Sequence, residues 1–185
     1  MELLLHREKK YNFFVSDTFT SNMLVPVIKN LLYKAENEWD DYDEIYHCCH
    51  LIETVKQNPN IIMDFHYIKK DDDIIGVGLV SHGMLDIPLF FPDTIHISEP
   101  TDNILVFNYF HISPEDRGNG GHWLRDIIIP YYYGKKFKSI YVKSSHPRVF
   151  NLYNRLGKCI GEYISKSDNG LYERLGKMFR ISLEK

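Results

Sequence analysis

The chain has 185 residues, of which 44% are apolar, so it can form one domain around one hydrophobic core and is not expected to be disordered. Its formal charge of −3 gives no general attraction to nucleic acid or to an anionic membrane. No apolar run reaches the roughly 18 residues of a membrane helix, and the apolar part of the opening MELLLHREKK is too short for a signal peptide.

The three cysteines are Cys48, Cys49 and Cys159, an odd and sparse set that does not form a disulfide framework. We therefore expect a reducing, cytoplasmic location. Cys48 and Cys49 lie between His47 and His50. Four adjacent helical residues cannot all face one ion, so no metal site is expected.

Two helices and a hairpin are expected in the first half of the chain. Met23–Ala35 and Asp41–Val55 have apolar residues at helical spacing. The spacing of the apolar residues then shortens to every second residue. This pattern predicts a β-hairpin around an acidic turn, with strands at Ile61–Lys69 and Ile74–Ser81. The proline-containing stretch Gly83–Asp102 is expected to be mostly irregular.

Strands and helices alternate in the second half. The expected elements are a central strand at Ile104–Ile112, a helix from about Gly121 to Tyr133, a strand at Ser139–Lys143, a helix at Pro147–Leu156, and strands at Cys159–Ser165 and Lys177–Leu183. This order predicts an α/β fold, with a mixed sheet flanked by helices, in a single domain of residues 1–185.

A glycine-rich turn, SPEDRGNGGHW at Ser113–Trp123, joins the central strand to the following helix. Its glycines let backbone N–H groups approach a ligand closely, and the helix N-terminus adds free donors and partial positive charge. The turn is therefore typical of a phosphate or diphosphate site. It lacks the Gly-Lys-Ser/Thr of a P-loop and the spacing of a dinucleotide-binding turn.

The turn resembles the acyl-CoA loop of the GNAT (Gcn5-related N-acetyltransferase) superfamily, Q/R-x-x-G-x-G/A. Two registers fit. In the first, Glu115–Gly120 matches both glycines, with Glu115 at the Gln/Arg position. In the second, Arg117–His122 keeps the arginine and ends in His122.

A second GNAT motif, N-P-x-A-x-x-L-Y-x-x-x-G-F, resembles HPRVFNLYNRLGK at His146–Lys158. The matching residues are Pro147, Leu152, Tyr153, Leu156 and Gly157. His146, Val149 and Lys158 depart from the motif. The two motifs come in the expected order, and the resemblance covers roughly residues 61–183.

The resemblance implies a GNAT-like fold with a central mixed sheet of about six to seven strands. It implies an enzyme that moves an acetyl group from acetyl-CoA to a primary amine by direct attack, without a metal. Many proteins of this family form dimers, although no patch in the sequence demands one, so a homodimer is left open.

The cofactor-binding residues follow from the two motifs and the central strand. The resemblance implies that pantetheine lies between the strand ending at Ile112 and the next one, with the thioester near Phe110 and Ile112. The residues assigned to acetyl-CoA are Phe110, Ile112, Arg117, Gly118, Asn119, Gly120, Gly121, His122, His146 and Arg148.

Tyr153 stands where the family has its general acid, so it is the expected proton donor to the departing thiolate. His111 lies on the central strand beside the presumed reaction centre, and its ordinary pKa range suits a general base. The alternative for both side chains is packing within the fold.

The segment from Ala35 to Val55 has seven acidic residues and no Lys or Arg. In the family the turn between the first two helices borders the acceptor groove. We therefore expect a cationic small-molecule amine, held by Trp39, Asp40, Asp41 and Asp43. The alternative is a solvated acidic surface.

Two other functions are left open. One is a non-catalytic module that binds acyl-CoA, and the other is a protein-interaction domain on the same fold. A nucleic-acid binder is not expected, because the lysines are not interleaved with aromatic residues on one face.

Overall fold

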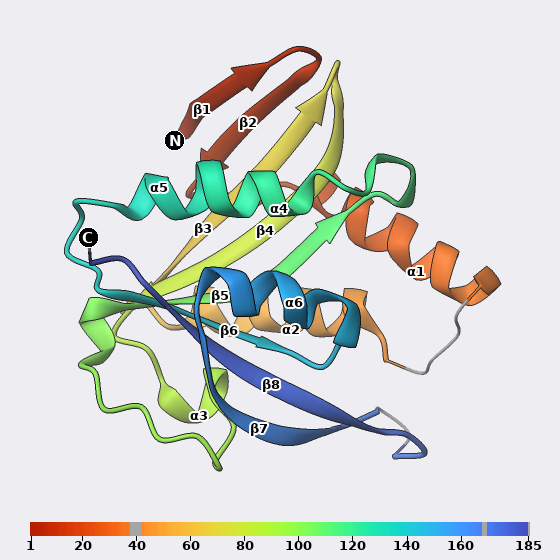
Figure 1. Ribbon diagram of the computed structural model, residues 1–185. Coiled ribbons are helices and arrows are strands. Elements are labelled where there is room, and N and C mark those ends of the chain that lie inside the picture. Colours follow the sequence, from red (N-terminus) through yellow and green to blue (C-terminus); the bar gives the residue numbers. More distant parts are fainter. Residues whose placement is uncertain (38–41, 168–169, 185) are drawn as a thin grey trace.

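The computed structural model describes residues 1–37, 42–167 and 170–184. One eight-stranded sheet runs through them in the order β1-β2-β3-β4-β5-β6-β8-β7, with only β5 and β6 parallel (Figure 1). The strands are β1 (Glu2–Glu8), β2 (Tyr11–Ser16), β3 (Ile61–Lys70), β4 (Asp73–Gly83), β5 (Ile104–Ile112), β6 (Ser139–Ser144), β7 (Lys158–Lys166) and β8 (Glu173–Ser182).

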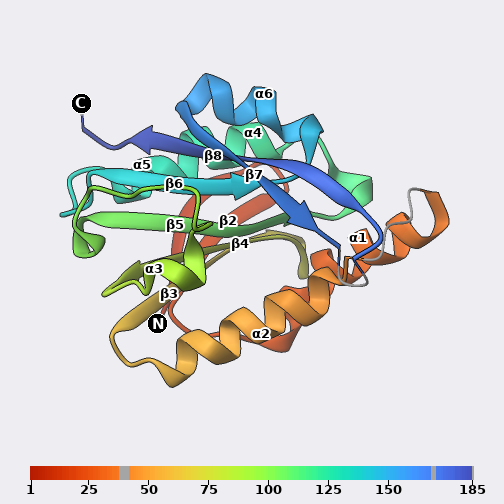
Figure 2. The same cartoon turned by 90° about the horizontal axis from the view of Figure 1, so that it is seen from below.

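Helices cover both faces of the sheet (Figure 2). One face carries η1 (Ser21–Leu24), α1 (Val25–Asn37), α2 (Glu44–Gln57) and α3 (Ile87–Phe90). The other carries a continuous helix made of α4 (Gly120–His122), the π-helical η4 (Trp123–Ile128) and α5 (Ile129–Tyr132), followed by α6 (Pro147–Leu156). Short 3₁₀ turns, η2 (Thr101–Asn103) and η3 (Pro114–Asp116), flank β5.

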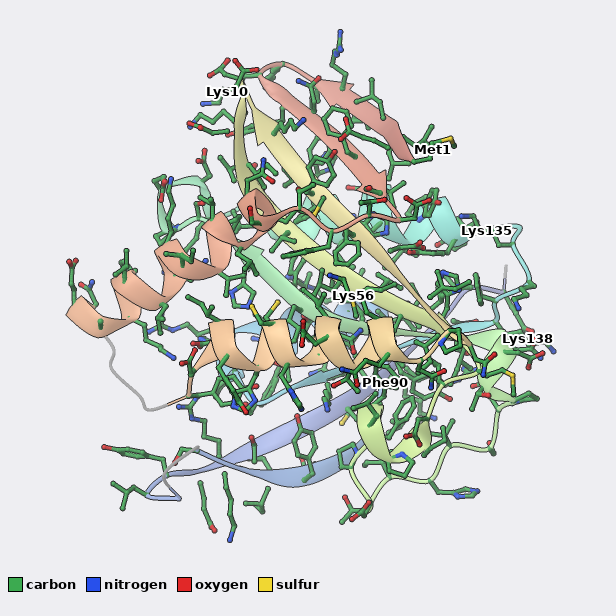
Figure 3. All side chains as sticks on the ribbon, turned by 180° about the vertical axis from the view of Figure 1, so that it is seen from behind. Met1, Lys10, Lys56, Phe90, Lys135 and Lys138 are labelled. Carbon is green, nitrogen blue, oxygen red and sulfur yellow. The ribbon has the colours of Figure 1, made fainter. Side chains whose placement is uncertain are left out.

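Each helical layer has its own hydrophobic core. The first includes Val27, Ile52 and Phe90, and the second includes Trp123 and Ile128. Figure 3 shows α1 and α2 lying across the sheet, with Lys56 on α2 and Phe90 on α3. The helix divides into α and π segments ahead of Pro130, which has no N–H for the bond to the fourth preceding carbonyl.

The predicted fold class is confirmed, and the sheet has one to two more strands than expected. The additional pair is the hairpin β1–β2, which the sequence analysis missed. Leu3 and Leu4 of β1 are exposed, so this edge strand lacks the alternation of a half-buried strand. Met1 and Lys10 mark its two ends in Figure 3.

A β-bulge at Asn108 changes the course of the central strand. Phe107 pairs with Val80 and Tyr109 with Leu79, so Asn108 is the extra residue on β5. Its Nδ2 donates to Ser81 Oγ at 2.8 Å and to Val106 O at 3.2 Å. The bulge reverses the alternation, so that Tyr109 packs toward α1 and α2 while Phe110 and Ile112 pack toward α4.

The parallel strands β5 and β6 separate at the same place. They pair from Ile104↔Ser139 to Phe107↔Val142 and no further within the described residues. Beyond that point β6 continues its pairing with β8, and β5 continues its pairing with β4. The backbone edge of residues 108–112 that faces β6 is therefore left without a strand partner.

A buried polar chain fastens α5 to β3. Tyr132 donates its hydroxyl proton to Asp64 Oδ2 at 2.7 Å, and its oxygen lies 2.9 Å from His66 Nε2. Because the phenol proton is used for Asp64, Nε2 of His66 must be the donor. His66 is fully buried, and this burial lowers its pKa from 6.5 to about 3.

The low pKa of His66 predicts destabilisation by acid. As the pH falls from about 7 to about 5, His66 takes up a proton in the unfolded chain but stays neutral in the folded protein. The free energy of unfolding therefore decreases by up to about 2 kcal/mol. In denaturant titrations, the decrease in the free energy of unfolding between pH 7 and pH 5 should be smaller by this amount in His66→Gln than in the native protein. The exposed control His96→Gln should retain the native dependence. An equal pH dependence in native protein and His66→Gln would contradict the assignment.

Candidate functional site

A cavity of about 970 Å³ opens where β5 and β6 separate. Its walls come from α1, α2 and the segment after α3, from the end of β5, from the glycine turn, from the end of β6 with α6, and from the hairpin β7–β8. Residues from almost every predicted site segment therefore meet in one place, although they are distant in the sequence.

The glycine turn forms one end of the cavity. Arg117, Gly118, Gly120 and Gly121 line it. Gly118 has a φ of +103°, a conformation that L side chains rarely adopt, and α4 begins two residues later. The first N–H groups of the helix are thus presented at the cavity end, as an anion site requires.

Gly120 also allows close packing against the central strand. A Cβ at this position would lie 3.0 Å from Phe110 and 3.3 Å from Ile112, and both side chains line the cavity. A larger residue at Gly120 would displace them. The glycine therefore sets how closely the turn approaches the open edge of β5.

Ion pairs hold the acidic part of the turn away from the cavity. Lys70 Nζ lies 2.8 Å from the buried Asp116 carboxylate, and the hydroxyl of Tyr11 donates to the same oxygen at 3.4 Å. Lys29 pairs with Glu115 on the surface. Glu115, the residue at the Gln/Arg position of the first motif register, thus contacts α1 and does not line the cavity.

Arg117 is directed toward α1. Its Nη2 donates to Asn30 Oδ1 at 2.9 Å, and its guanidinium lies 4.4 Å from the ring centroid of Tyr33. Asn30 Nδ2 in turn donates to Ile112 O at 2.7 Å and to Pro26 O at 2.8 Å. One amide side chain therefore joins α1, the end of β5 and the glycine turn.

Asn119 and His122 do not line the cavity among the described residues. Asn119 Nδ2 donates to Asp116 O at 3.0 Å inside the turn. His122 lies between Glu8 Oε2 at 3.0 Å and Asp126 Oδ2 at 2.8 Å. The structure thus gives no support to a phosphate contact by the His122 imidazole, which is directed at two carboxylates.

Tyr153 on α6 and His111 on β5 line the same cavity. Tyr153 is buried against Phe179, with ring centroids 5.4 Å apart, and burial raises the pKa of its phenol. Burial, with the charges of Lys34 and His146, lowers the pKa of His111 to about 4. At neutral pH the phenol is therefore protonated and the imidazole is neutral, as a proton donor and a proton acceptor require.

His146 and Arg148 lie at the start of α6, in the cavity wall facing β5. His146 is the N-cap residue, and its backbone N–H donates to Ser144 Oγ at 3.2 Å. The site thus gathers eight of the ten residues assigned to the cofactor, all except Asn119 and His122.

The predicted acceptor residues are only partly described. Trp39, Asp40 and Asp41 lie outside the described residues. Asp43 caps α2, because its Oδ1 accepts from Tyr46 N at 2.9 Å. The next residues, Tyr42 and Glu44, line the cavity.

Comparison with solved structures gives the same architecture. A putative acetyltransferase of the GNAT family from Desulfovibrio desulfuricans superposes with a TM-score of 0.57 at 11% identity, over 94% of this chain and 99% of that one. A putative acetyltransferase of Salmonella typhimurium with its cofactor acetyl-CoA gives 0.56 at 8% identity, over 96% of both chains. The chain has the GNAT fold.

A third structure with the GNAT fold is a chimera of the spermidine N-acetyltransferase SpeG from Vibrio cholerae and hSSAT, with a TM-score of 0.56 at 16% identity over 95% of this chain and 96% of that one. No family profile and no curated protein sequence matches the chain. The similarity is therefore one of fold. Within the described residues, no helix is long and apolar enough to cross a membrane.

Two asparagines that shape this candidate site were not predicted from the sequence. Asn108 stands alone among apolar and aromatic residues in ILVFNYFHI, and such a polar interruption of a buried strand is a usable sign of a bulge. Asn30 gives no local sign, because its partners Ile112 and Arg117 lie more than eighty residues away.

Asn30→Ala tests the acetyl-CoA site expected from the sequence, because Ile112 O and Arg117 both lose a partner in this variant. We expect the Kd for acetyl-CoA to rise about tenfold, close to the loss of one or two hydrogen bonds. Calorimetric titration measures the change. Asn37→Ala is the matched control, since Asn37 also bonds the carbonyl four residues back on α1. Equal Kd values for the two variants would show that Asn30 does not support the site.

Proposed function

We propose that this protein transfers an acetyl group from acetyl-CoA to a primary amine. The main observation behind this proposal is that the open edge of β5 and the glycine turn line one cavity together with Tyr153 and His111. Similarity of fold to GNAT acetyltransferases, one of them solved with acetyl-CoA, supports the proposal.

The cavity fits an extended acyl-pantetheine chain with a diphosphate at one end. Residues 108–112 have no strand partner on the β6 side, and among their carbonyls Ile112 O already accepts from Asn30 Nδ2. The remaining backbone groups of this edge can hydrogen-bond a pantetheine chain as they would a strand. The N–H groups around Gly118–Gly121 would hold the diphosphate. Arg148 and His146 would contact the cofactor from the opposite wall.

Acetyl-CoA supplies an activated acetyl thioester. The acceptor ammonium first loses one proton. The neutral amine nitrogen then forms a bond to the acetyl carbon, the carbon–sulfur bond breaks, the bonded nitrogen loses a second proton, and the departing thiolate takes up a proton. A backbone N–H in the stretch Phe110–Ile112 would polarise the carbonyl. His111 would accept the proton of the amine, and Tyr153 would donate a proton to the sulfur.

Tyr153→Phe tests the proton donor. We expect kcat to fall about 10²-fold, while the Kd for acetyl-CoA changes less than about threefold, because the ring and its packing are retained. Thiol release with a panel of amines and calorimetry with acetyl-CoA give the two quantities. Tyr133→Phe, on the exposed end of the helix, is the control.

Three results would decide between the candidates. No binding of CoA or acetyl-CoA by the native protein would overturn the proposed function and leave the protein-interaction alternative. Binding without thiol release from any amine would indicate the non-catalytic module. Unchanged kcat in Tyr153→Phe would assign the proton donation to another group.

His111→Gln tests the proton acceptor. Its low pKa keeps the native imidazole neutral above about pH 4, so its own titration should not limit the rate at neutral pH. We expect kcat/KM to fall about 10²-fold at pH 7 and to recover partly as the amine itself deprotonates toward its pKa of about 10. A pH–rate series measures this. A uniform loss at all pH values would indicate a packing role.

The cytoplasmic location, the single domain and a homodimer stay predictions from the sequence. The cationic acceptor proposed from Trp39, Asp40, Asp41 and Asp43 receives no support from the described part of the site, because Asp43 is used as a helix cap.

A further inference from the structure

A half-buried ion pair lies in the wall of the cavity. Lys34 Nζ donates to both carboxylate oxygens of Glu44, at 2.8 and 2.7 Å, and to Tyr42 O at 2.7 Å. The side chains are 13% and 22% exposed, so solvent screens the pair less than an ordinary surface pair. The three acceptor oxygens match the three protons of the ammonium group.

This pair faces the predicted reaction centre. Lys34, Tyr42 and Glu44 line the same cavity as His111, and the charge of Lys34 acts on the His111 imidazole. Tyr42 hydrogen-bonds Tyr109, whose ring stacks on that of His111 with centroids 6.1 Å apart. The contacts thus lead from the ion pair to the face of β5 opposite the glycine turn.

Glu44 is the only Asp or Glu that lines the cavity in the part of the chain that the structure describes. Both of its oxygens are engaged by Lys34. The cationic residues in the same lining are Lys34, Arg117, Lys143, Arg148 and Arg174. A second positive charge on an acceptor would lie near the Lys34 ammonium, which repels it, and the Glu44 carboxylate that could pair with it is already paired with Lys34.

We propose that Lys34 is a specificity-determining residue, which occupies Glu44 and thereby selects against acceptors that carry a second positive charge near the reacting amine. The acceptor class is then a primary amine with a neutral or anionic remainder. The inference rests on the proposed acetyl transfer and replaces the cationic acceptor expected from the sequence.

Three amines with the same four-carbon chain test the proposal: butylamine, 1,4-diaminobutane and 4-aminobutanoate. For the native protein, kcat/KM measured by thiol release from acetyl-CoA should be at least about tenfold lower for the diamine than for butylamine, and highest for 4-aminobutanoate. A native preference for the diamine would overturn the proposal and would implicate the acidic residues Glu38, Asp40 and Asp41.

Substitutions on the two sides of the pair should act in opposite directions. Lys34→Gln frees the Glu44 carboxylate and should raise the diamine-to-butylamine ratio of kcat/KM about tenfold. Glu44→Gln leaves the Lys34 charge and should lower that ratio further. Both substitutions break the same contact, so a purely structural role would shift the ratio equally in both.

Lys34→Arg retains the charge and should retain the native ratio. Lys29→Gln is the matched control, since it removes another ion-paired lysine of α1 that does not line the cavity. An unchanged ratio in Lys34→Gln would overturn the inference alone. If the native protein did not bind acetyl-CoA, the proposed function would be overturned. If it bound acetyl-CoA but acetylated none of the three amines, the proposed acceptor class would be overturned.

Discussion

The separation of β5 from β6 is the constraint on which the site depends. Parallel strands normally continue to pair, but the extra residue at Asn108 redirects β5 while β6 stays with β8. The result is a row of backbone groups without a strand partner inside the protein. Buried backbone groups without partners are costly, so this edge is suited to a ligand that hydrogen-bonds as a strand does.

The same bulge decides which side chains meet in the cavity. Without it, residues 109 and 111 would lie on the face of Leu105, toward α4. With it, Tyr109 and His111 lie toward α1 and α2, where Lys34 and Glu44 approach them. Phe110 and Ile112 then pack on Gly120. One inserted residue therefore separates a side of β5 that faces Lys34 and Glu44 from a side that supports the glycine turn.

Most of the fold was predictable because local patterns are strong in this chain. The strand at Ile104–Ile112 and the helix at Pro147–Leu156 were predicted with their observed limits, since apolar runs, Pro147 and Gly157 mark them. The hairpin β1–β2 was not, because its edge strand is exposed. The direction of His122 was not either, because its partner Glu8 lies on that unpredicted strand.

The role of Lys34 also depends on contacts that no periodic pattern contains. The sequence shows an acidic segment after α1, and charge alone suggested attraction of cations. The structure places a lysine of α1 against the first carboxylate of α2, at 2.7 Å. A charge count along the chain therefore does not give the charge presented to a ligand.

The N-terminal hairpin contacts the helix that follows the glycine turn. Glu8 reaches His122, Phe13 lies 6.5 Å from the buried Trp123, and Tyr11 contacts Asp116. Shortened versions of the protein that begin after β2 would thus lack the outer support of the helix whose N-terminus lies at the glycine turn. Such shortened versions would retain every motif residue and still misplace them, so preparations intended for ligand work should begin at the first strand.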